Sequence, residues 1–343
     1  MSTQGSHSSG APAPLLELLE LRTHFFTDEG VARAVDGVSC SVLPGQSLGL
    51  VGESGCGKSV TALSIMGLVP RPGRVVAGRV LFQGEDLLLK SEDELRALRG
   101  GQIAMVFQEP MTALNPVFSI GSQIIEAIEL HTDLDPVAAR AHAIAMLRRV
   151  GIPNPERRAD DFPHQLSGGM QQRVMIAMAI SCRPALLIAD EPTTALDVTI
   201  QAQILDLIRE LQVESGMSLL LITHDLAVVA ETAQHVAVMY AGKIVEHAAV
   251  GDFFERPRHP YSIGLLRALP GRSRANERAA GRRLPTIPGI VPNATRFPSG
   301  CRFRTRCPVA SERCALEEPS LQAARPASGH AVACHHPEEA LGL

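Results

Sequence analysis

The chain has 343 residues, of which 45% are hydrophobic and 20% are charged, enough to bury the core of one large domain with an appendage or of two domains. Its net charge of −4, its lack of tryptophan and its two tyrosines argue against a protein that binds nucleic acid by charge or by base stacking. No apolar run approaches the roughly 20 residues that span a bilayer, and residues 1–14 lack a cationic start and an apolar stretch. We therefore expect a disordered N-terminus, no signal peptide and a chain that stays in the cytoplasm.

Strand and helix signals alternate along most of the chain. Apolar and polar residues alternate over 15–50, and an apolar run over 46–51 ends in glycines ahead of a helical stretch at 58–68. Further strands are predicted at 80–83, 103–107, 185–189 and 218–223, helices at 119–132, 136–150, 170–181 and 199–214, and a hairpin at 235–249. The pattern predicts an α/β fold around a largely parallel sheet, with a helical insertion over about residues 110–165.

A glycine-rich loop joins the apolar run at 46–51 to the helix that follows it. Its residues match G-x-x-x-x-G-K-S/T and are followed by Val60: Gly52, Glu53, Ser54, Gly55, Cys56, Gly57, Lys58 and Ser59. The glycines let backbone N–H groups turn inward around phosphate oxygens, and the helix adds its positive end. We expect Lys58 to reach the β- and γ-phosphates of a nucleotide and the Ser59 hydroxyl to coordinate Mg²⁺.

A second apolar strand, at 185–189, ends in two adjacent acids. Asp190 is expected to hold Mg²⁺ through water, and Glu191 points elsewhere and can polarise an attacking water molecule. An acidic strand end alone would be an ordinary solvated feature. Downstream of a phosphate loop it predicts nucleotide hydrolysis.

Ser167, Gly168 and Gly169 form a second anion site at the start of a predicted helix. One nucleotide does not need two such sites, but two chains packed head to tail do, because each Ser-Gly-Gly then closes on the ATP of the other chain. With this motif the chain resembles the nucleotide-binding subunits of ABC transporters over about residues 15–255. The resemblance implies ATP and Mg²⁺ as cofactors and an antiparallel N-terminal β part beside the parallel core.

The resemblance also assigns roles to single residues. Gln108 matches the glutamine that touches Mg²⁺ and the lytic water, and His224 matches the switch histidine that contacts the γ-phosphate. Ser167 and Gly169 match the contacts to the opposite γ-phosphate, and Asp197 matches the D-loop. Phe26 is a candidate for stacking on adenine, although a role as an ordinary strand-edge or core phenylalanine fits it equally well. Met170 departs from the glutamine that many members carry after Ser-Gly-Gly.

Several segments resemble the dipeptide and oligopeptide importer subfamily more specifically. They are residues 108–116 and 190–201, the run from Arg258 to Tyr261, which reads Arg-His-Pro-Tyr, and the run from Pro288 to Asn293. The resemblance implies an ATPase at the cytoplasmic face of the inner membrane, peripherally bound. Its implied partners are a second ABC ATPase subunit in a heterodimer, two integral-membrane permease subunits, an extracytoplasmic solute-binding protein and no nucleic acid. The implied cargo is a di- or oligopeptide, with nickel, glutathione or another small solute as the alternative.

Two classes of ABC protein outside transport fit the sequence less well. Translation or DNA-repair ABC proteins usually carry paired nucleotide domains or long coiled coils, which this sequence lacks. An assembly ATPase without a pore is disfavoured by the His-Pro-Tyr run. We therefore expect a nucleotide-binding domain over 15–255, a C-terminal importer-type domain over 256–337 and a tail over 338–343.

Four of the seven cysteines crowd into this C-terminal segment: Cys301, Cys307, Cys314 and Cys334. No Cys-x2-Cys pair occurs, so a standard zinc ribbon fits poorly, and the spacing leaves metal binding, free thiols and disulfides open. Some peptide-importer ATPases carry a [4Fe–4S] cluster on four such cysteines. The resemblance therefore makes that cluster the expected occupant, with zinc as the alternative.

Overall fold

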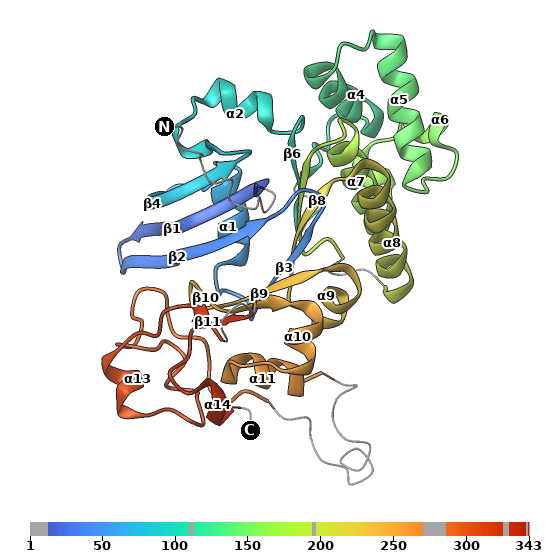
Figure 1. The fold of residues 1–343 in the computed structure, drawn as a ribbon. Coiled ribbons are helices and arrows are strands. Elements are labelled where there is room, and N and C mark those ends of the chain that lie inside the picture. Colours follow the sequence, from blue (N-terminus) through green and yellow to red (C-terminus); the bar gives the residue numbers. More distant parts are fainter. Residues whose placement is uncertain are drawn as a thin grey trace, which may run out of the picture.

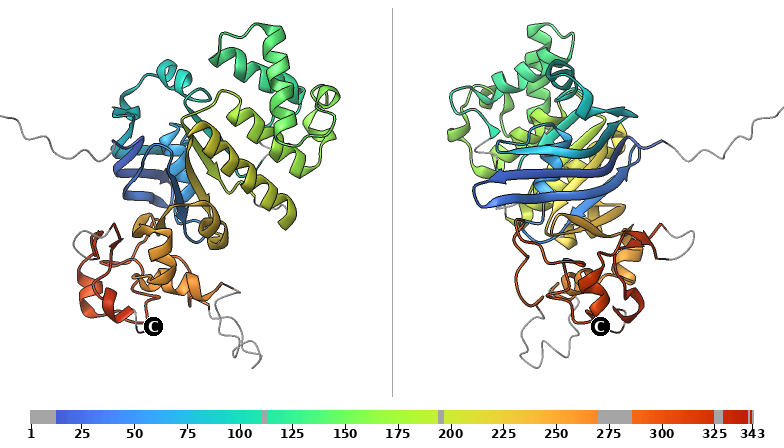
Figure 2. Two further views of the ribbon diagram at one scale, coloured as in Figure 1. Left: turned by 45° about the vertical axis from the view of Figure 1, so that its right-hand side comes forward. Right: turned by 90° about the vertical axis from the view of Figure 1, so that its left-hand side faces the viewer.

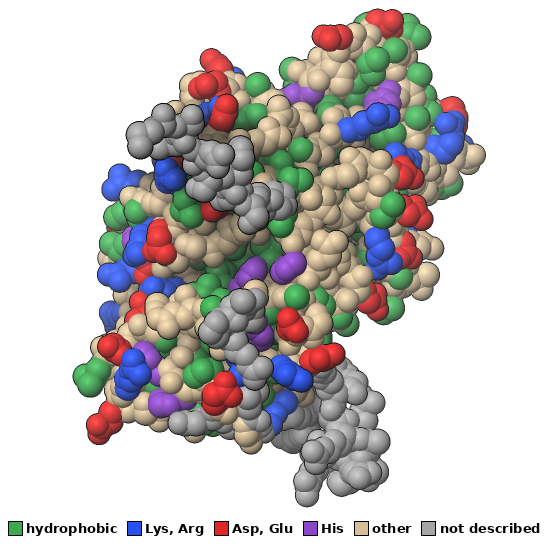
Figure 3. Space-filling model, viewed as in Figure 1, with side chains coloured by type: hydrophobic (Ala, Val, Ile, Leu, Met, Phe, Trp, Pro, Cys, Tyr) green, Lys and Arg blue, Asp and Glu red, His purple; other side chains and the backbone are tan. Residues whose placement is uncertain are grey.

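The computed structural model describes residues 13–109, 113–193, 197–269, 286–324, 329–340 and 342. Two β-sheets lie at the centre, the predicted helical insertion projects from one end, and the C-terminal segment packs at the other (Figures 1 and 2). None of the helices in the described ranges combines the length and hydropathy that crossing a bilayer requires. On the face in Figure 3, acidic and basic side chains are interspersed.

The smaller sheet is antiparallel, with the strand order β2-β1-β4-β5. Its strands are β1 (Leu16–Thr27), β2 (Gly30–Val42), β4 (Gly73–Phe82) and β5 (Glu85–Asp86). Leu16, Leu18 and Leu21 of β1 face inward and are almost fully buried, while polar residues between them face outward. This sheet confirms the expected antiparallel N-terminal β part.

The larger sheet has the strand order β11-β12-β10-β9-β3-β8-β7-β6. Its strands are β3 (Ser47–Val51), β6 (Ile103–Val106), β7 (Leu186–Asp190), β8 (Ser218–Thr223), β9 (His235–Tyr240), β10 (Lys243–Ala249), β11 (Gln322–Ala323) and β12 (Ala331–Val332). Strands β9, β3, β8, β7 and β6 run parallel to their neighbours in that order. Every residue of β3, β6, β7 and β8 is buried, as expected for parallel strands covered on both faces.

Helices pack against this sheet and form the projecting insertion. They are α1 (Lys58–Ile65), α2 (Glu92–Leu98), α4 (Ile120–His131), α5 (Pro136–Arg149), α6 (Pro155–Arg158), α7 (Gly168–Ile180), α8 (Val198–Ser215), α9 (Leu226–Thr232) and α10 (Val250–Glu255), with 3-10 turns at Leu87–Leu89 and Pro163–Gln165. The longer helices agree with the apolar spacing, and the predicted α/β architecture with its helical subdomain is confirmed. One core cluster joins α4, α5, α7 and α8 to the sheet.

The C-terminal segment continues the large sheet instead of starting a separate one. Strand β12 pairs antiparallel with β10, and β11 pairs with β12. Its helices are short: α11 (Pro260–Arg267), α13 (Glu312–Leu316) and α14 (Pro337–Ala340). Tyr240 of β9, Tyr261 of α11 and Phe303 pack ring against ring with centroids 4.7 to 5.5 Å apart, which adds roughly 1 kcal/mol per pair beyond area burial. An aromatic core thus joins the segment to the sheet.

Candidate active site

The phosphate loop lies between the end of β3 and the start of α1, and two of its glycines leave no room for a side chain. A Cβ on Gly57 would lie 2.2 Å from the Ala34 carbonyl oxygen, and one on Gly52 would lie 2.2 Å from that of Met239. Both residues have positive φ, 109° and 155°, which L side chains rarely adopt. The glycine pattern in the sequence therefore has a steric cause.

Lys58 is the first residue of α1, and its ammonium folds back over the loop. Its Nζ donates to the carbonyl oxygens of Gly52 and Glu53 at 2.8 and 3.1 Å. The side chain is buried, so the charge is fixed against the loop's own backbone. The neighbouring Cys56 is buried too, and burial raises the pKa of its thiol, which makes it a poor target for oxidation.

Asp190 ends β7 beside the start of α1. Its Oδ1 is buried and has no hydrogen-bond partner in the described structure, a costly arrangement for a carboxylate. Burial raises the pKa of this carboxyl, and a hydrogen bond from Ser59 works in the opposite direction. A carboxylate and a hydroxyl side by side, with one oxygen left over, fit the hard oxygen-preferring cation Mg²⁺.

Three polar side chains meet at the carboxyl ends of adjacent parallel strands. Gln108 follows β6, Glu191 follows β7 and His224 follows β8. Gln108 Nε2 donates to Glu191 Oε2 at 3.3 Å, and His224 Nδ1 lies 3.1 Å from Glu191 Oε1. Gln108 and His224 are exposed, whereas the Glu191 side chain is only 13% exposed. The cluster places a largely buried carboxylate between an amide donor and an imidazole ring.

Glu191 also adopts a strained backbone, with φ at 45°. This left-handed region costs a non-glycine residue roughly 1–2 kcal/mol. Its N–H donates to the Ile222 carbonyl of β8 at 2.8 Å, so the neighbouring strand holds it in place. Such strain is concentrated at functional sites.

The other predicted nucleotide residues lie at helix starts. Ser167 caps α7 through a 3.4 Å bond from Met170 N to its Oγ, and both Ser167 and Gly168 are exposed. Asp197 caps α8, accepting from Ile200 N at 3.0 Å. Ala195 and Leu196, which precede Asp197 in the predicted D-loop, lie outside the described residues.

Phe26 lies near the end of β1, beside the turn into β2. Its side chain is 41% exposed, and the Arg74 guanidinium lies over the ring, 4.5 Å from its centroid. One face of the ring therefore already packs against a cation. Its role in adenine stacking stays a prediction.

The structure contradicts the predicted [4Fe–4S] cluster and gives no support to zinc, its alternative. Across the described ranges, which include all four tail cysteines, no group of three or more His, Cys, Asp or Glu side chains is placed to hold a metal ion. The four cysteines border a cavity of only about 10 Å³, barely the room one water needs. Burial raises the pKa of Cys307 to about 11 and of Cys334 to about 12.

Two residues of the C-terminal segment reach the phosphate loop, and sequence reasoning missed both contacts. Tyr261 Oη accepts from Glu53 N at 2.8 Å, and Arg306 donates to both carboxylate oxygens of Glu53 at 2.6 and 3.0 Å. Tyr261 belongs to the Arg-His-Pro-Tyr run, but its spacing gave no sign of its target. Arg306 stood out only as one of several arginines among the cysteines.

Comparison with known proteins supports the interpretation of this geometry. Residues 35–194 match the ABC transporter family, and residues 245–314 match the oligopeptide/dipeptide transporter C-terminal region. The chain belongs to the ABC transporter family. It is 52% identical over 328 residues to the dipeptide transport ATP-binding protein DppD of Escherichia coli strain K12, covering 96% of this chain and 98% of that protein. It is 51% identical over 324 residues to DppD of Haemophilus influenzae, covering 94% and 96%.

A solved structure gives the same fold for the cassette. It is the dimeric, post-hydrolysis state of the ATP-binding cassette MJ0796 bound to ADP and Pi, with a TM-score of 0.63, 26% identity, and coverage of 68% of this chain and 98% of that one. The chain is therefore an ABC-type ATPase whose cofactors are ATP and Mg²⁺. Asp190 Oδ1, without a partner, and the phosphate loop fit both.

Proposed function

We propose that this ABC ATPase powers the uptake of di- or oligopeptides across the inner membrane. Two observations support the cargo class. The relatives that match along nearly the whole chain are dipeptide transport ATP-binding proteins, and the match to the oligopeptide/dipeptide transporter C-terminal region falls on the segment that packs against β9 and β10.

The nucleotide is held by the phosphate loop in this proposal. Backbone N–H groups of residues 52–60 surround the phosphates, and Lys58 exchanges its bonds to the loop carbonyls for bonds to the β- and γ-phosphates. Ser59 and Gln108 would hold Mg²⁺, and Asp190 would hold it through water. When bound, Mg²⁺ neutralises charge on the phosphate oxygens. Phe26 stacks on the adenine.

The observation that carries the catalytic assignment is the cluster of Gln108, Glu191 and His224. Glu191 accepts a proton from the attacking water. The oxygen of that water bonds to the γ-phosphorus as the bond between the γ-phosphorus and the ADP oxygen breaks. Gln108 orients the water. His224, already in contact with Glu191, contacts the γ-phosphate and completes the polar lining.

The catalytic unit in this proposal is a pair of ATPase subunits. Ser167 and Gly168 are exposed at the start of a 13-residue helix, whose positive end favours an anion. Ser167, Gly168 and Gly169 then close on the ATP of the partner subunit, with Asp197 at the interface. The MJ0796 cassette to which this chain is similar is described as dimeric. We propose a second, different ABC ATPase as the partner.

The segment after Gln108 supports docking of two permease subunits. Val117 and Phe118 lie between β6 and α4 and are 69% and 54% exposed, and large apolar residues exposed side by side mark interaction surfaces. Docking there places the chain peripherally at the cytoplasmic face of the inner membrane. An extracytoplasmic binding protein delivers the cargo, and ATP binding and hydrolysis shift the complex between two states.

Glu191→Gln tests the hydrolytic role. The amide cannot accept the water proton, so turnover should fall by about 10²–10⁴-fold while ATP binding persists. Glu210→Gln, on an exposed position of α8, is the matched control and should keep full turnover. Unchanged ATPase activity in Glu191→Gln would reject the assignment of the base.

The cargo needs a separate test. The chain, a second ATPase, two permeases and a binding protein are reconstituted in vesicles, and uptake of labelled dipeptide, glutathione and nickel is compared. ATP-dependent uptake of dipeptide supports the proposal. Uptake of nickel or glutathione alone would contradict it.

A further inference from the structure

We propose that the C-terminal segment positions the phosphate loop, with Arg306 and Tyr261 as positioning residues that act through Glu53. This inference rests on the proposed role of the loop in holding ATP. It assigns the segment a part in nucleotide affinity, which follows from contacts between residues more than 200 positions apart in sequence.

Glu53 is held by the C-terminal segment at both its backbone and its side chain. Its N–H donates to Tyr261 Oη at 2.8 Å. Its carboxylate accepts from Arg306 Nη1 and Nη2 at 2.6 and 3.0 Å, a bidentate pairing that fixes direction as well as distance. The backbone and the side chain of this loop residue are therefore both constrained from outside the nucleotide-binding domain.

The two anchors are themselves rigid. The Arg306 side chain is only 3% exposed. Its Nε donates to the Pro288 carbonyl at 2.8 Å, and its guanidinium lies 5.7 and 5.9 Å from the ring centres of Tyr240 and Phe303. Tyr261 is fully buried in the same aromatic cluster. Because Arg306 and Tyr261 are packed in this way, a movement of the loop would break their hydrogen bonds to Glu53.

Glu53 in turn carries part of the lysine's environment. Lys58 Nζ bonds the Glu53 carbonyl at 3.1 Å and the Gly52 carbonyl at 2.8 Å. Arg306 and Tyr261 therefore contact Glu53, which in turn contacts Lys58, the residue proposed to bind the nucleotide phosphates. If the first loop residues were mobile, Lys58 would also sample several positions before ATP binds. Ordering these residues on binding would then reduce the binding free energy.

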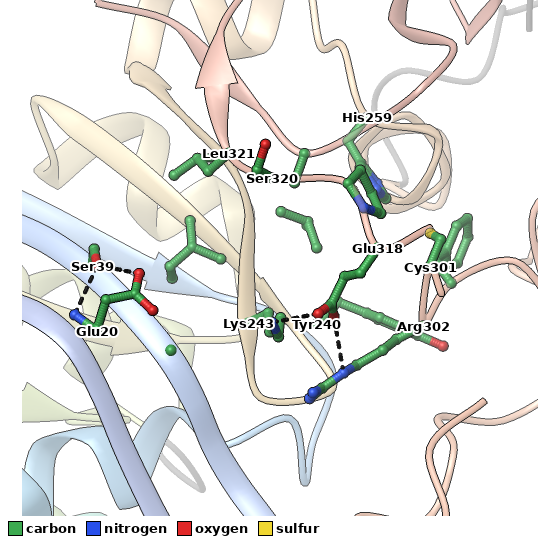
Figure 4. A pocket seen from close by; sticks show the side chains of 16 residues that line it. Glu20, Ser39, Tyr240, Lys243, His259, Cys301, Arg302, Glu318, Ser320 and Leu321 are labelled. Atoms are coloured by element: carbon green, nitrogen blue, oxygen red, sulfur yellow. Dashed lines mark hydrogen bonds and ion pairs between the residues drawn. The ribbon is translucent and has the colours of Figure 1, made fainter. Parts of the chain in front are cut away.

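A second set of contacts prevents the segment from moving as a body. Arg302 donates to the Ala241 carbonyl at 2.6 Å and to the Asp36 carboxylate. The adjacent Gly242 N–H donates to the Cys56 carbonyl of the loop at 2.9 Å. In Figure 4, Glu318 bridges Lys243 of β10 and Arg302 across a cavity of about 400 Å³, at 2.7 and 3.4 Å.

Thermodynamic linkage makes the coupling reciprocal. If the C-terminal segment improves ATP affinity by some factor, ATP binding must stabilise the docked segment by the same factor. Any partner that displaced Arg306 would weaken ATP binding without touching the nucleotide.

The primary experiment measures equilibrium binding of a fluorescent ATP analogue with Mg²⁺ to the full-length chain. Arg306→Met should raise Kd about tenfold, the size of one lost charge-assisted hydrogen bond. Tyr261→Phe should raise it about threefold, and Arg306→Lys should fall between Met and wild type because it keeps charge but loses the fork. Arg313→Met is the control, because it breaks an exposed pair between Arg313 of α13 and Glu317, the residue after that helix.

A binding role and a merely structural one give different readouts. In the assembled ATPase, Arg306→Met should raise the KM for ATP while kcat at saturation stays within about twofold, because Arg306 does not touch the reacting atoms. Combining Arg306→Met with Glu53→Gln should raise Kd no further than the worse single variant, as expected for two residues that act through one contact. Additive effects, or a fall in kcat alone, would overturn the inference.

Hydrogen exchange of the unmodified chain gives a test that does not depend on a variant folding. ATP–Mg²⁺ should slow exchange of amides over residues 301–308 by about the same factor that Arg306→Met costs in Kd. No change there, together with wild-type affinity of Arg306→Met, would reject the inference. Loss of turnover in Glu191→Gln would still stand, so the two proposals can fail separately.

Discussion

Polar side chains differ in exposure and hydrogen bonding between the nucleotide site and the place where β10 meets the C-terminal segment. Around the nucleotide site they are exposed or incompletely bonded: Gln108, Ser167 and His224 are exposed, and Asp190 Oδ1 has no partner in the described structure. Where β10 meets the C-terminal segment, a carboxylate is instead buried and fully bonded. Glu246, fully buried, accepts from the backbone N–H of Arg258 and His259 at 2.7 and 2.9 Å and lies 2.7 Å from His330 Nε2.

The difference distinguishes polar groups that a ligand would complete from polar groups whose hydrogen bonds are made within the protein. A buried polar atom without a partner is costly, and at Asp190 Oδ1 a bound Mg²⁺ would supply the missing partner. A buried carboxylate with three partners already has its hydrogen bonds and fixes the chain around it. Losses at the nucleotide site should therefore appear in turnover, and losses at a buried, fully bonded group such as Glu246 should appear in stability.

The largest effect on stability is expected from Glu246→Ala. It leaves the backbone N–H groups of Arg258 and His259 without their acceptor in a buried position and removes one partner of His330, which should lower the free energy of unfolding by about 3–5 kcal/mol. Urea unfolding measures the change. Glu318→Ala, which removes a partly exposed partner of Lys243, should cost about 1 kcal/mol or less. Equal effects of the two substitutions would break the comparison.

A pH dependence of intermediate size is expected from His259. Burial lowers the pKa of this histidine to about 4 from an ordinary value of 6.5, and its Nδ1 accepts from Tyr261 N at 3.1 Å. The unfolded chain therefore binds the extra proton first, and stability falls as pH drops from about 6.5 towards 4. The loss attributable to this residue should be about 2 kcal/mol at pH 5.

Unfolding at pH 7.5 and pH 5 checks this expectation. His259→Asn keeps an acceptor at the start of α11 but does not titrate, so its share of the pH dependence should vanish. His247, whose pKa burial also lowers to about 4, keeps its own share. If His259→Asn shows the full wild-type pH dependence, the assignment to His259 is wrong.

The smallest effect on stability, with a larger one on turnover, is expected from Ser167→Ala. Its capping bond is long and exposed, so the substitution should cost about 1 kcal/mol or less. If Ser167 donates to the partner's nucleotide as proposed, turnover of the paired ATPase should nevertheless fall at least about tenfold. Asp135→Ala, which removes the cap of α5, is the matched control. A parallel fall in turnover there would show that any lost cap, not the ligand contact, is responsible.

Much of the cassette was predictable because its signals are local. The buried runs of β3, β7 and β8 and the helical spacing of α4, α5, α7 and α8 appear directly as periodicity. The first half of β4 was missed, since Gly78 and Arg79 interrupt its apolar pattern. The short helices α9, α11 and α13 have too few turns to display a period, and tertiary packing stabilises them instead.

The C-terminal segment was predicted as a region but not as a structure. Cysteine spacing suggested a cluster, yet spacing in the chain does not fix where the thiols point, and among the described residues they form no group placed to hold a metal ion. Glu246 and His330 carry no motif. Their pairing depends on β12 joining β10, a contact between residues more than 80 positions apart.

The sequence alone determined the phosphate loop, the paired acids after β7, the helix start at Ser167 and the family that combines them, because each depends on residues a few positions apart. Only the tertiary structure showed that Gln108, Glu191 and His224 meet, since three parallel strands bring their ends to one edge of the sheet. It alone placed Arg306 and Tyr261 on Glu53. Which residue a buried side chain contacts 200 or more positions away is decided by tertiary packing, and no local sequence pattern indicates it.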